Sequence, residues 1–287
     1  MTIALKKIGI IGAGQMGSGI AHVSAVAGYD VLLYDFSTEQ IENGIATVSG
    51  NMARQVSSGK IEEAERQAAL SHIRPAEKMD DLAGCDLVIE AATEDETVKR
   101  KIFAQLCPVL NPEAVIATNT SSISITRLAA QTDRPERFIG IHFMNPVPVM
   151  KLVEIIRALQ TSDEVCATID GVSRAIGKTP HTIKDSYGFV VNRVLILMIN
   201  EAINCLYEGL TEPDEIDAVM RLGANHPMGP LALADLIGLD VVLNIMQTLY
   251  TGFDDPKYRP SPLLKQMVDA GYFGRKTGRG FHKYENS

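Results

Sequence analysis

Short apolar runs alternate with helical patterns over the first two-thirds of the chain. Apolar runs at 7–11 and 30–34 predict two buried strands, and the stretch 16–27 between them predicts a helix. Further strands are predicted at 86–90, 114–118, 138–142, 152–156 and 181–184, and further helices at 38–57, 61–70, 96–107 and 163–176. Strands that alternate with helices predict an α/β fold with a doubly wound, mostly parallel sheet. Thr161 and Glu164 form a capping-box pattern at the start of the last of these helices.

After about residue 186 the pattern becomes helical throughout. The run 188–207 is too long for a strand and apolar nearly all round, which predicts a buried helix covered by its neighbours or by another subunit. Additional helices are predicted at 214–222, 230–250 and 261–270. We therefore predict an α/β domain over 1–186 and an all-helical domain for substrate binding and dimerisation over 187–287. A homodimer is expected, and a monomer with a well-covered internal helix is the alternative.

Composition narrows the classes of partner. The chain has 287 residues, is 46% hydrophobic and 22% charged, and carries a formal net charge of −8. This charge argues against a general affinity for nucleic acid or anionic membranes, and no apolar run reaches the length of a membrane span. The four cysteines form no Cys-x-x-Cys pair, the histidines show no metal-binding spacing, and the N-terminus lacks a signal-peptide pattern. We expect a cytoplasmic protein without a metal site.

A glycine-rich turn lies where the first strand meets the first helix. In Gly12-Ala13-Gly14-Gln15-Met16-Gly17, the first glycine permits a tight turn, Gly14 lets the backbone approach a pyrophosphate, and Gly17 allows close packing of helix on strand. Asp35 ends the second strand, where a carboxylate can accept both ribose hydroxyls of NAD and would repel the 2′-phosphate of NADP. The sequence therefore predicts a Rossmann-type domain that binds NAD.

Polar residues follow three further strands, at the sheet edge where open α/β sheets bind ligands. They are the segments 118–122 and 142–146 and the carboxylate Glu154, which lies inside an apolar strand. A buried carboxylate needs a partner, and His142 on a neighbouring strand end would form with it a general base. The alternative is a surface glutamate and a separately satisfied core histidine. Asn192, on the apolar helix, is either buried for structure or directed at a substrate oxygen.

Eight motifs in this order along the chain together resemble one enzyme family. They are 12–17 (GAGQMG), 90–94 (EAATE), 119–122 (NTSS), 142–146 (HFMNP), 150–154 (MKLVE), 188–193 (GFVVNR), 225–230 (NHPMGP) and 274–280 (GRKTGRG). The chain resembles the short-chain (S)-3-hydroxyacyl-CoA dehydrogenases over essentially its whole length, and most of all the bacterial single-function members that act on 3-hydroxybutyryl-CoA. Tyr187 departs from the pattern, since relatives usually carry proline there.

The resemblance implies a role for each matching residue. His142 would be the base, Glu154 would orient it, and Ser121 and Asn192 would bind the substrate's oxygens. The cofactor-binding residues would be Gly12, Gly14, Met16, Gly17, Asp35, Glu94, Lys99, Asn119, Ser121, Asn145 and Lys276. Arg54 and Lys60 flank a polar turn and would contact the nucleotide end of coenzyme A; the alternative is that they are solvated charges on a helix face.

The implied activity is NAD-dependent interconversion of a (S)-3-hydroxyacyl-CoA and a 3-ketoacyl-CoA. The expected substrate pair is short, 3-hydroxybutyryl-CoA and acetoacetyl-CoA. Two alternatives remain. One is a dehydrogenase of free β-hydroxy acids, although such enzymes generally use a lysine in place of a His–Glu pair. The other is a non-catalytic NAD-binding protein of the lens-crystallin kind, which has no physical reason to keep a buried charge pair.

Overall fold

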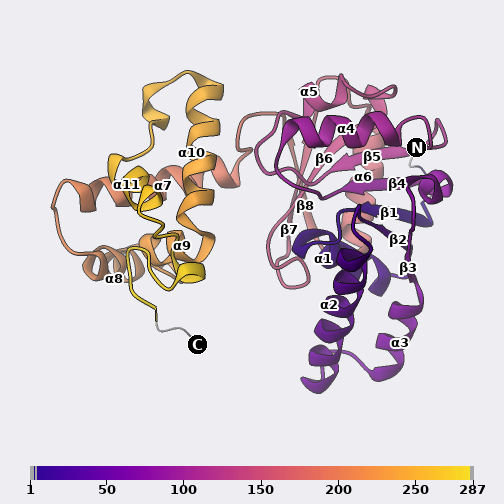
Figure 1. Ribbon diagram of the computed structural model, residues 1–287, viewed down its shortest axis with the longest axis horizontal. Coiled ribbons are helices and arrows are strands. Elements are labelled where there is room, and N and C mark those ends of the chain that lie inside the picture. The colour runs from indigo at the N-terminus through magenta and orange to yellow at the C-terminus, as the bar shows by residue number, and fades with distance from the viewer. Residues whose placement is uncertain (1–2, 4, 285–287) are drawn as a thin grey trace. The chain divides into compact units, whose positions relative to one another are not determined.

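The chain forms two units, Met1–Ser186 and Tyr187–Ser287, which are shown in Figure 1. This computed structural model describes residue 3 and residues 5–284. The first unit is a sheet covered by helices and the second is helical. The predicted fold class, a Rossmann-type sheet followed by a helical domain, is confirmed.

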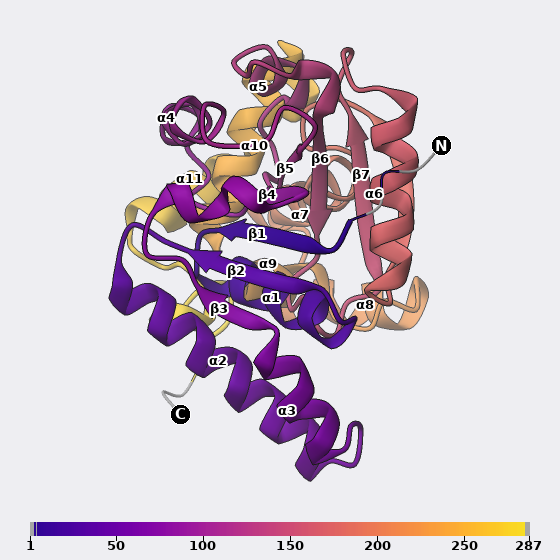
Figure 2. The ribbon, with the colours of Figure 1, turned by 90° about the vertical axis from the view of Figure 1, so that its right-hand side faces the viewer.

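The first unit is built on one sheet of eight strands in the order β3-β2-β1-β4-β5-β6-β7-β8. Figure 2 shows the part of this order from β3 to β7. The strands are β1 (Lys7–Ile11), β2 (Asp30–Tyr34), β3 (Ile73–Pro75), β4 (Leu87–Glu90), β5 (Val115–Thr118), β6 (Phe138–Phe143), β7 (Leu152–Arg157) and β8 (Thr179–Lys184). β1 to β6 run parallel, β7 pairs antiparallel with β6, and β8 runs parallel to β7. The sequence does not predict β3, because three residues are too few to show a period.

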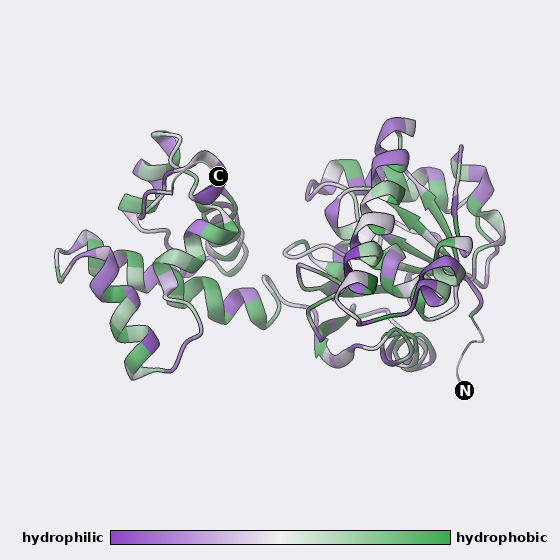
Figure 3. Cartoon of the chain, turned by 90° about the horizontal axis from the view of Figure 1, so that it is seen from below, coloured by the Kyte–Doolittle hydropathy of each residue, from purple (hydrophilic) through white to green (hydrophobic). Residues whose placement is uncertain are grey.

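Helices cover both faces of this sheet. They are α1 (Gln15–Val26), α2 (Thr38–Ser57), α3 (Glu63–Ser71), α4 (Glu96–Leu106), α5 (Ile125–Ala129) and α6 (Asp163–Ala175). Ile20 of α1 and Ile169 of α6 belong to one core with Ile10 and the other strand side chains of that face. On the opposite face Phe103 of α4 packs edge-on against Phe138 of β6, with ring centroids 5.1 Å apart. Figure 3 shows the strands as mostly hydrophobic between helices of mixed character.

The capping box predicted for α6 is wrong. The cap is Ser162, one residue later, whose hydroxyl accepts a hydrogen bond from the amide of Val165 at 3.2 Å. Thr161 is buried and its hydroxyl donates to the carbonyl of Phe138 at 2.7 Å. The hydroxyl of Thr161 therefore bonds to β6, and it does not cap α6 as the local sequence pattern predicts.

The second unit contains α7 (Val191–Tyr207), α8 (Pro213–Gly223), α9 (Pro230–Ile237), α10 (Leu239–Phe253) and α11 (Pro262–Asp269). α7 is not covered all round within the described chain: Ile196, Ile199 and Ile203 are buried, whereas Val194 is 65% exposed. The single helix predicted at 230–250 is wrong, because Gly238 adopts φ +103° and separates α9 from α10. Among the described residues no single helix could cross a membrane by length and hydropathy; α9 and α10 meet that test only together, and they are bent by 97°.

Candidate active site

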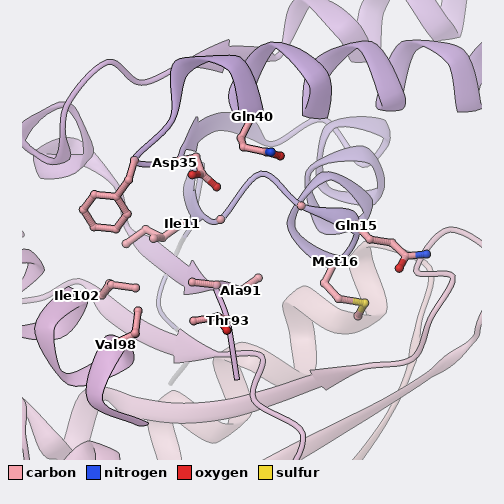
Figure 4. Close-up of a pocket in the computed structure, with 13 residues that line it drawn as sticks. Ile11, Gln15, Met16, Asp35, Gln40, Ala91, Thr93, Val98 and Ile102 are labelled. Carbon is pink, nitrogen blue, oxygen red and sulfur yellow. The ribbon is translucent and has the colours of Figure 1, made fainter. Parts of the chain in front are cut away.

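A cavity of about 440 Å³ lies at the carboxyl ends of β1, β2 and β4 (Figure 4). The predicted residues Gly12, Gly14, Met16 and Asp35 line it. Its other lining residues are Ile11, Gln15, Phe36, Gln40, Ala91, Ala92, Thr93, Val98 and Ile102. The cavity therefore combines the glycine-rich turn with an apolar wall from β4 and α4, which suits a flat, partly apolar nucleotide.

Each glycine of this turn has different steric surroundings, which explain why a glycine is found there. Gly12 has φ +100°, and a Cβ there would lie 2.6 Å from the carbonyl oxygen of Ala91. A Cβ on Gly17 would lie 1.7 Å from the carbonyl oxygen of Gly12, so no larger residue fits between helix and turn. A Cβ on Gly14 would meet nothing within 4 Å. Gly14 thus leaves open space at the start of α1, where a helix N-terminus favours a phosphate.

Asp35 links the second strand to this turn. Its Oδ2 accepts a hydrogen bond from the amide of Ala13 at 2.8 Å, and its Oδ1 accepts one from the amide of Ser37 at 3.2 Å. The carboxylate faces the cavity, and none of the described residues that line the cavity is an arginine or a lysine. A ribose with free hydroxyls fits this arrangement, and a 2′-phosphate does not. The open space at Gly14 and the carboxylate of Asp35 together fit NAD.

A buried ion pair that the sequence does not predict lies beside the cavity. Nζ of Lys99 is 2.7 and 2.9 Å from the two carboxylate oxygens of Glu90, and both side chains are almost completely buried. Glu90 also accepts hydrogen bonds from the hydroxyl of Thr118 (2.6 Å) and the amide of Ala92 (2.7 Å). Lys99, expected in the cofactor cleft, has its ammonium on Glu90 and does not line the cavity. A glutamate ending an apolar strand, nine residues before a lysine, is the only sequence signal for this pair.

Glu94 holds the turn that carries Ser121. Its Oε1 accepts hydrogen bonds from the amide and hydroxyl of Ser121, at 2.9 and 3.1 Å, and from the amide and hydroxyl of Ser122, both at 2.9 Å. The hydroxyl of Thr120 donates to the same oxygen at 2.7 Å. Two of the predicted residues, Glu94 and Ser121, are therefore in direct contact at the ends of β4 and β5.

His142 and Glu154 lie opposite each other on the antiparallel pair β6 and β7. Nδ1 of His142 is 2.8 Å from Oε2 of Glu154, and the two residues are 7% and 2% exposed. The alternative of a surface glutamate and a separate histidine therefore does not hold. The carboxylate can hold the imidazole in one tautomer, with the proton on Nδ1, and can stabilise it when it is protonated. Asn119, from the end of β5, accepts a hydrogen bond from the amide of Phe143 at 2.9 Å.

The remaining predicted residues lie on other segments of the chain. Asn145 is exposed on the loop after β6, and Arg54 and Lys60 are exposed near the turn between α2 and α3. Two belong to the second unit: Asn192 is the second residue of α7, and Lys276 forms an ion pair with Asp240 at 2.6 Å. Among residues 3 and 5–284, no group of three or more His, Cys, Asp or Glu side chains could hold a metal ion.

Comparison with known proteins identifies relatives over the full length. Residues 7–186 match the model of the 3-hydroxyacyl-CoA dehydrogenase NAD binding domain, and residues 188–284 match that of the 3-hydroxyacyl-CoA dehydrogenase C-terminal domain. The chain is 58% identical to 3-hydroxybutyryl-CoA dehydrogenase of Bradyrhizobium diazoefficiens over 287 residues, covering 100% of this chain and 98% of the relative. It is 50% identical to a probable 3-hydroxybutyryl-CoA dehydrogenase of Deinococcus radiodurans, covering 97% and 100%.

The fold of this chain is also similar to those of solved structures. The crystal structure of (S)-3-hydroxybutyryl-CoA dehydrogenase from Ralstonia eutropha superposes with a TM-score of 0.97 at 53% identity, covering 99% of this chain and 100% of that one. The family resemblance inferred from the eight motifs is confirmed.

Proposed function

The chain belongs to the 3-hydroxyacyl-CoA dehydrogenase family and is an NAD-dependent oxidoreductase, and we propose that it interconverts 3-hydroxybutyryl-CoA and acetoacetyl-CoA. One observation carries the assignment of the base: the buried 2.8 Å contact between His142 and Glu154. The full-length relatives named for 3-hydroxybutyryl-CoA support the short acyl chain.

In the proposed mechanism His142 moves the proton of the 3-hydroxyl group. Because Nδ1 is held by Glu154, Nε2 is the nitrogen that accepts this proton during oxidation and returns it during reduction. The negative charge of Glu154 stabilises the imidazolium that forms, so its effect falls mainly on the transition state. When bound, NAD supplies the hydride acceptor at its nicotinamide ring.

Ser121 and Asn192 orient the substrate in this proposal. Ser121 is held by Glu94, so its hydroxyl has a fixed place at the end of β5. In this proposal Ser121 hydrogen-bonds the 3-oxygen, and Asn192 binds a substrate oxygen. Fixed donors at these positions lower the barrier by orienting C3 and by stabilising charge as it develops.

Arg54 and Lys60 contact the phosphates of coenzyme A in this proposal. Both are exposed side chains near the turn between α2 and α3. The protein is acidic overall, with a net charge of −8, and a polyanionic substrate therefore needs local positive charge. Asn119, Asn145 and Lys276 are proposed to lie toward the nicotinamide end of the cofactor.

We propose a homodimer formed mainly through the second unit. Large apolar side chains are exposed on or next to its helices, among them Val194, Leu210 and Leu222. Exposed apolar groups of this size are typical of protein interfaces. Light scattering should give twice the chain mass of 31.2 kDa at micromolar concentration, and a mass of one chain would contradict the dimer. A cytoplasmic location is proposed because the four cysteines are free thiols.

A steady-state assay tests the function. We expect acetoacetyl-CoA with NADH to give a higher kcat/KM than longer 3-ketoacyl-CoA substrates, and free acetoacetate to be a poor substrate. A preference for the free acid would favour a β-hydroxyacid dehydrogenase. NADH binding without turnover of any of these compounds would favour a non-catalytic protein.

A further inference from the structure

Lys178 is a buried lysine without a carboxylate partner. It lies at the turn between α6 and β8 and is 8% exposed. The ion-paired lysines of the described chain are Lys99, Lys257 and Lys276, so Lys178 is not among them. Burial, and next the charge of Lys151, lower the pKa of Lys178. An ammonium in such a place is costly unless its hydrogens are bonded, so the fold must use them.

The ammonium of Lys178 holds the loop 144–151, which joins β6 to β7. Nζ donates to the carbonyl of Val147 and to the carbonyl of Met150, the latter at 2.9 Å. The loop is also closed internally, because the amides of Val149 and Met150 both donate to the carbonyl of Pro146 at 3.0 Å. The loop is therefore compact, and the ammonium of Lys178, the residue just before β8, binds it to the start of that strand.

The other side of the loop rests on α1. Val147 is 2% exposed, and a Cβ on Gly19 would lie 2.9 Å from its Cβ. His22, one turn further along α1, is buried as well; burial lowers its pKa, a hydrogen bond with Gln55 opposes this, and the charge of Lys178 lowers it further. The lowered pKa of His22 reduces the positive charge that could compete with Lys178. The loop is thus held between the ammonium of Lys178 and the surface of α1.

This loop joins the two strands that carry His142 and Glu154. His142 and Glu154 are direct partners in the present register of β6 and β7. In an antiparallel pair, a slip of one residue turns every side chain of one strand to the opposite face, and the connecting loop fixes the register. A slip at this loop would therefore separate the imidazole from the carboxylate.

We propose that Lys178 is a positioning residue, which fixes the loop 144–151 and through it the alignment of His142 with Glu154. Lys178 does not touch the reacting atoms in this proposal. The inference rests on the proposed function only through the role given to His142; the contact that Lys178 maintains is a property of the fold.

The test is the variant Lys178→Met, which keeps the length of the side chain and removes its charge and donors. The control is Lys184→Met, a change of an exposed lysine at the far end of β8. We expect kcat with acetoacetyl-CoA to fall by about 10- to 10²-fold, as small misplacements of catalytic groups do. KM for acetoacetyl-CoA should stay close to that of the wild type, and Lys184→Met should behave like the wild type throughout.

A spectroscopic signature separates positioning from stability. The proton that Nδ1 of His142 shares with Glu154 should give a low-field NMR signal in the wild type. This signal should broaden or vanish in Lys178→Met and persist in Lys184→Met. A folded Lys178→Met protein with a normal signal and a normal kcat, or with only a lower Tm, overturns the proposal.

A second variant covers failure of Lys178→Met to fold. Gly19→Ala pushes the loop from the side of α1, where alanine is a better helix residue than glycine and should preserve folding. It should show the same loss of kcat and of the low-field signal; wild-type behaviour in both would overturn the proposal. If Glu154→Gln keeps a normal kcat, the proposed base is wrong, while the NMR signal still reports whether Lys178 maintains the contact.

Discussion

Two buried glutamates lie at the same edge of the sheet, and they differ in their partners. Glu90 at the end of β4 is bound by the ammonium of Lys99, by a hydroxyl and by an amide, so both of its oxygens are fully used. Glu154 on β7 is bound to the imidazole of His142. A lysine keeps its charge over the physiological pH range, whereas a histidine gains and loses a proton there. Equal burial therefore does not imply an equal role: the first pair suits structure and the second suits proton transfer.

The largest effect is expected for Glu154→Gln. Gln keeps the size but loses the charge that stabilises the imidazolium, so kcat should fall by about 10²–10⁴-fold. KM, the Kd for NADH and the Tm should change little. Steady-state kinetics and fluorescence titration with NADH measure these quantities, and Glu164→Gln on the exposed start of α6 is the matched control. A folded variant with wild-type kcat would show that the base has been paired with the wrong residue.

The opposite result is expected for Lys99→Met: the protein should lose folding stability and keep its kcat. Removing one partner leaves the charge of Glu90 buried and uncompensated, which costs roughly 3–5 kcal/mol of folding stability. Urea unfolding measures the loss, and the double variant Glu90→Gln with Lys99→Met should recover part of it, since no charge then stays buried. The kcat of the folded fraction should be close to that of the wild type. Normal stability with weaker NADH binding would instead place Lys99 in contact with the cofactor.

A third carboxylate, that of Asp35, faces the cofactor cavity. It should repel the 2′-phosphate of NADPH. The wild type should prefer NADH to NADPH by roughly 10²-fold or more in kcat/KM, because like charges brought together cost several kcal/mol. Asp35→Asn should reduce the ratio of kcat/KM for NADH to that for NADPH, mainly by raising kcat/KM for NADPH. Equal kcat/KM for the two cofactors in the wild type would contradict the role assigned to Asp35.

The smallest effect is expected for the exposed charge of Arg54. Exposed ionic contacts contribute about 0.2–1 kcal/mol, so Arg54→Ala should raise KM for acetoacetyl-CoA by roughly 1.5- to 5-fold at low salt and by less at high salt. Acetoacetyl-pantetheine lacks the nucleotide and serves as the control substrate, whose KM should not change. An unchanged KM for acetoacetyl-CoA, with an unchanged salt dependence, would mean that Arg54 is a solvated surface charge.

The sequence by itself determined the features that depend on local pattern. Apolar runs of strand length and the change to helical periodicity after residue 186 were enough for the fold class, and the spacing of Gly12, Gly14 and Gly17 was enough for the turn at the cofactor site. These features follow from steric demands and burial within a few neighbouring residues, so they can be seen in the chain itself. The single helix predicted at 230–250 failed at Gly238, because one residue in a positive-φ conformation interrupts a helix without changing its apolar period.

Only the tertiary structure decided which polar groups meet. It paired Lys99, which the resemblance assigns to the cofactor cleft, with Glu90, and it showed that Lys178 donates to a carbonyl of the loop between β6 and β7. It also showed that Glu154, which the sequence offered only as a possible partner of His142, contacts the imidazole. The physical reason is that the partner of a buried charge depends on strand order and register, which bring together residues distant in sequence, and no local period encodes that choice.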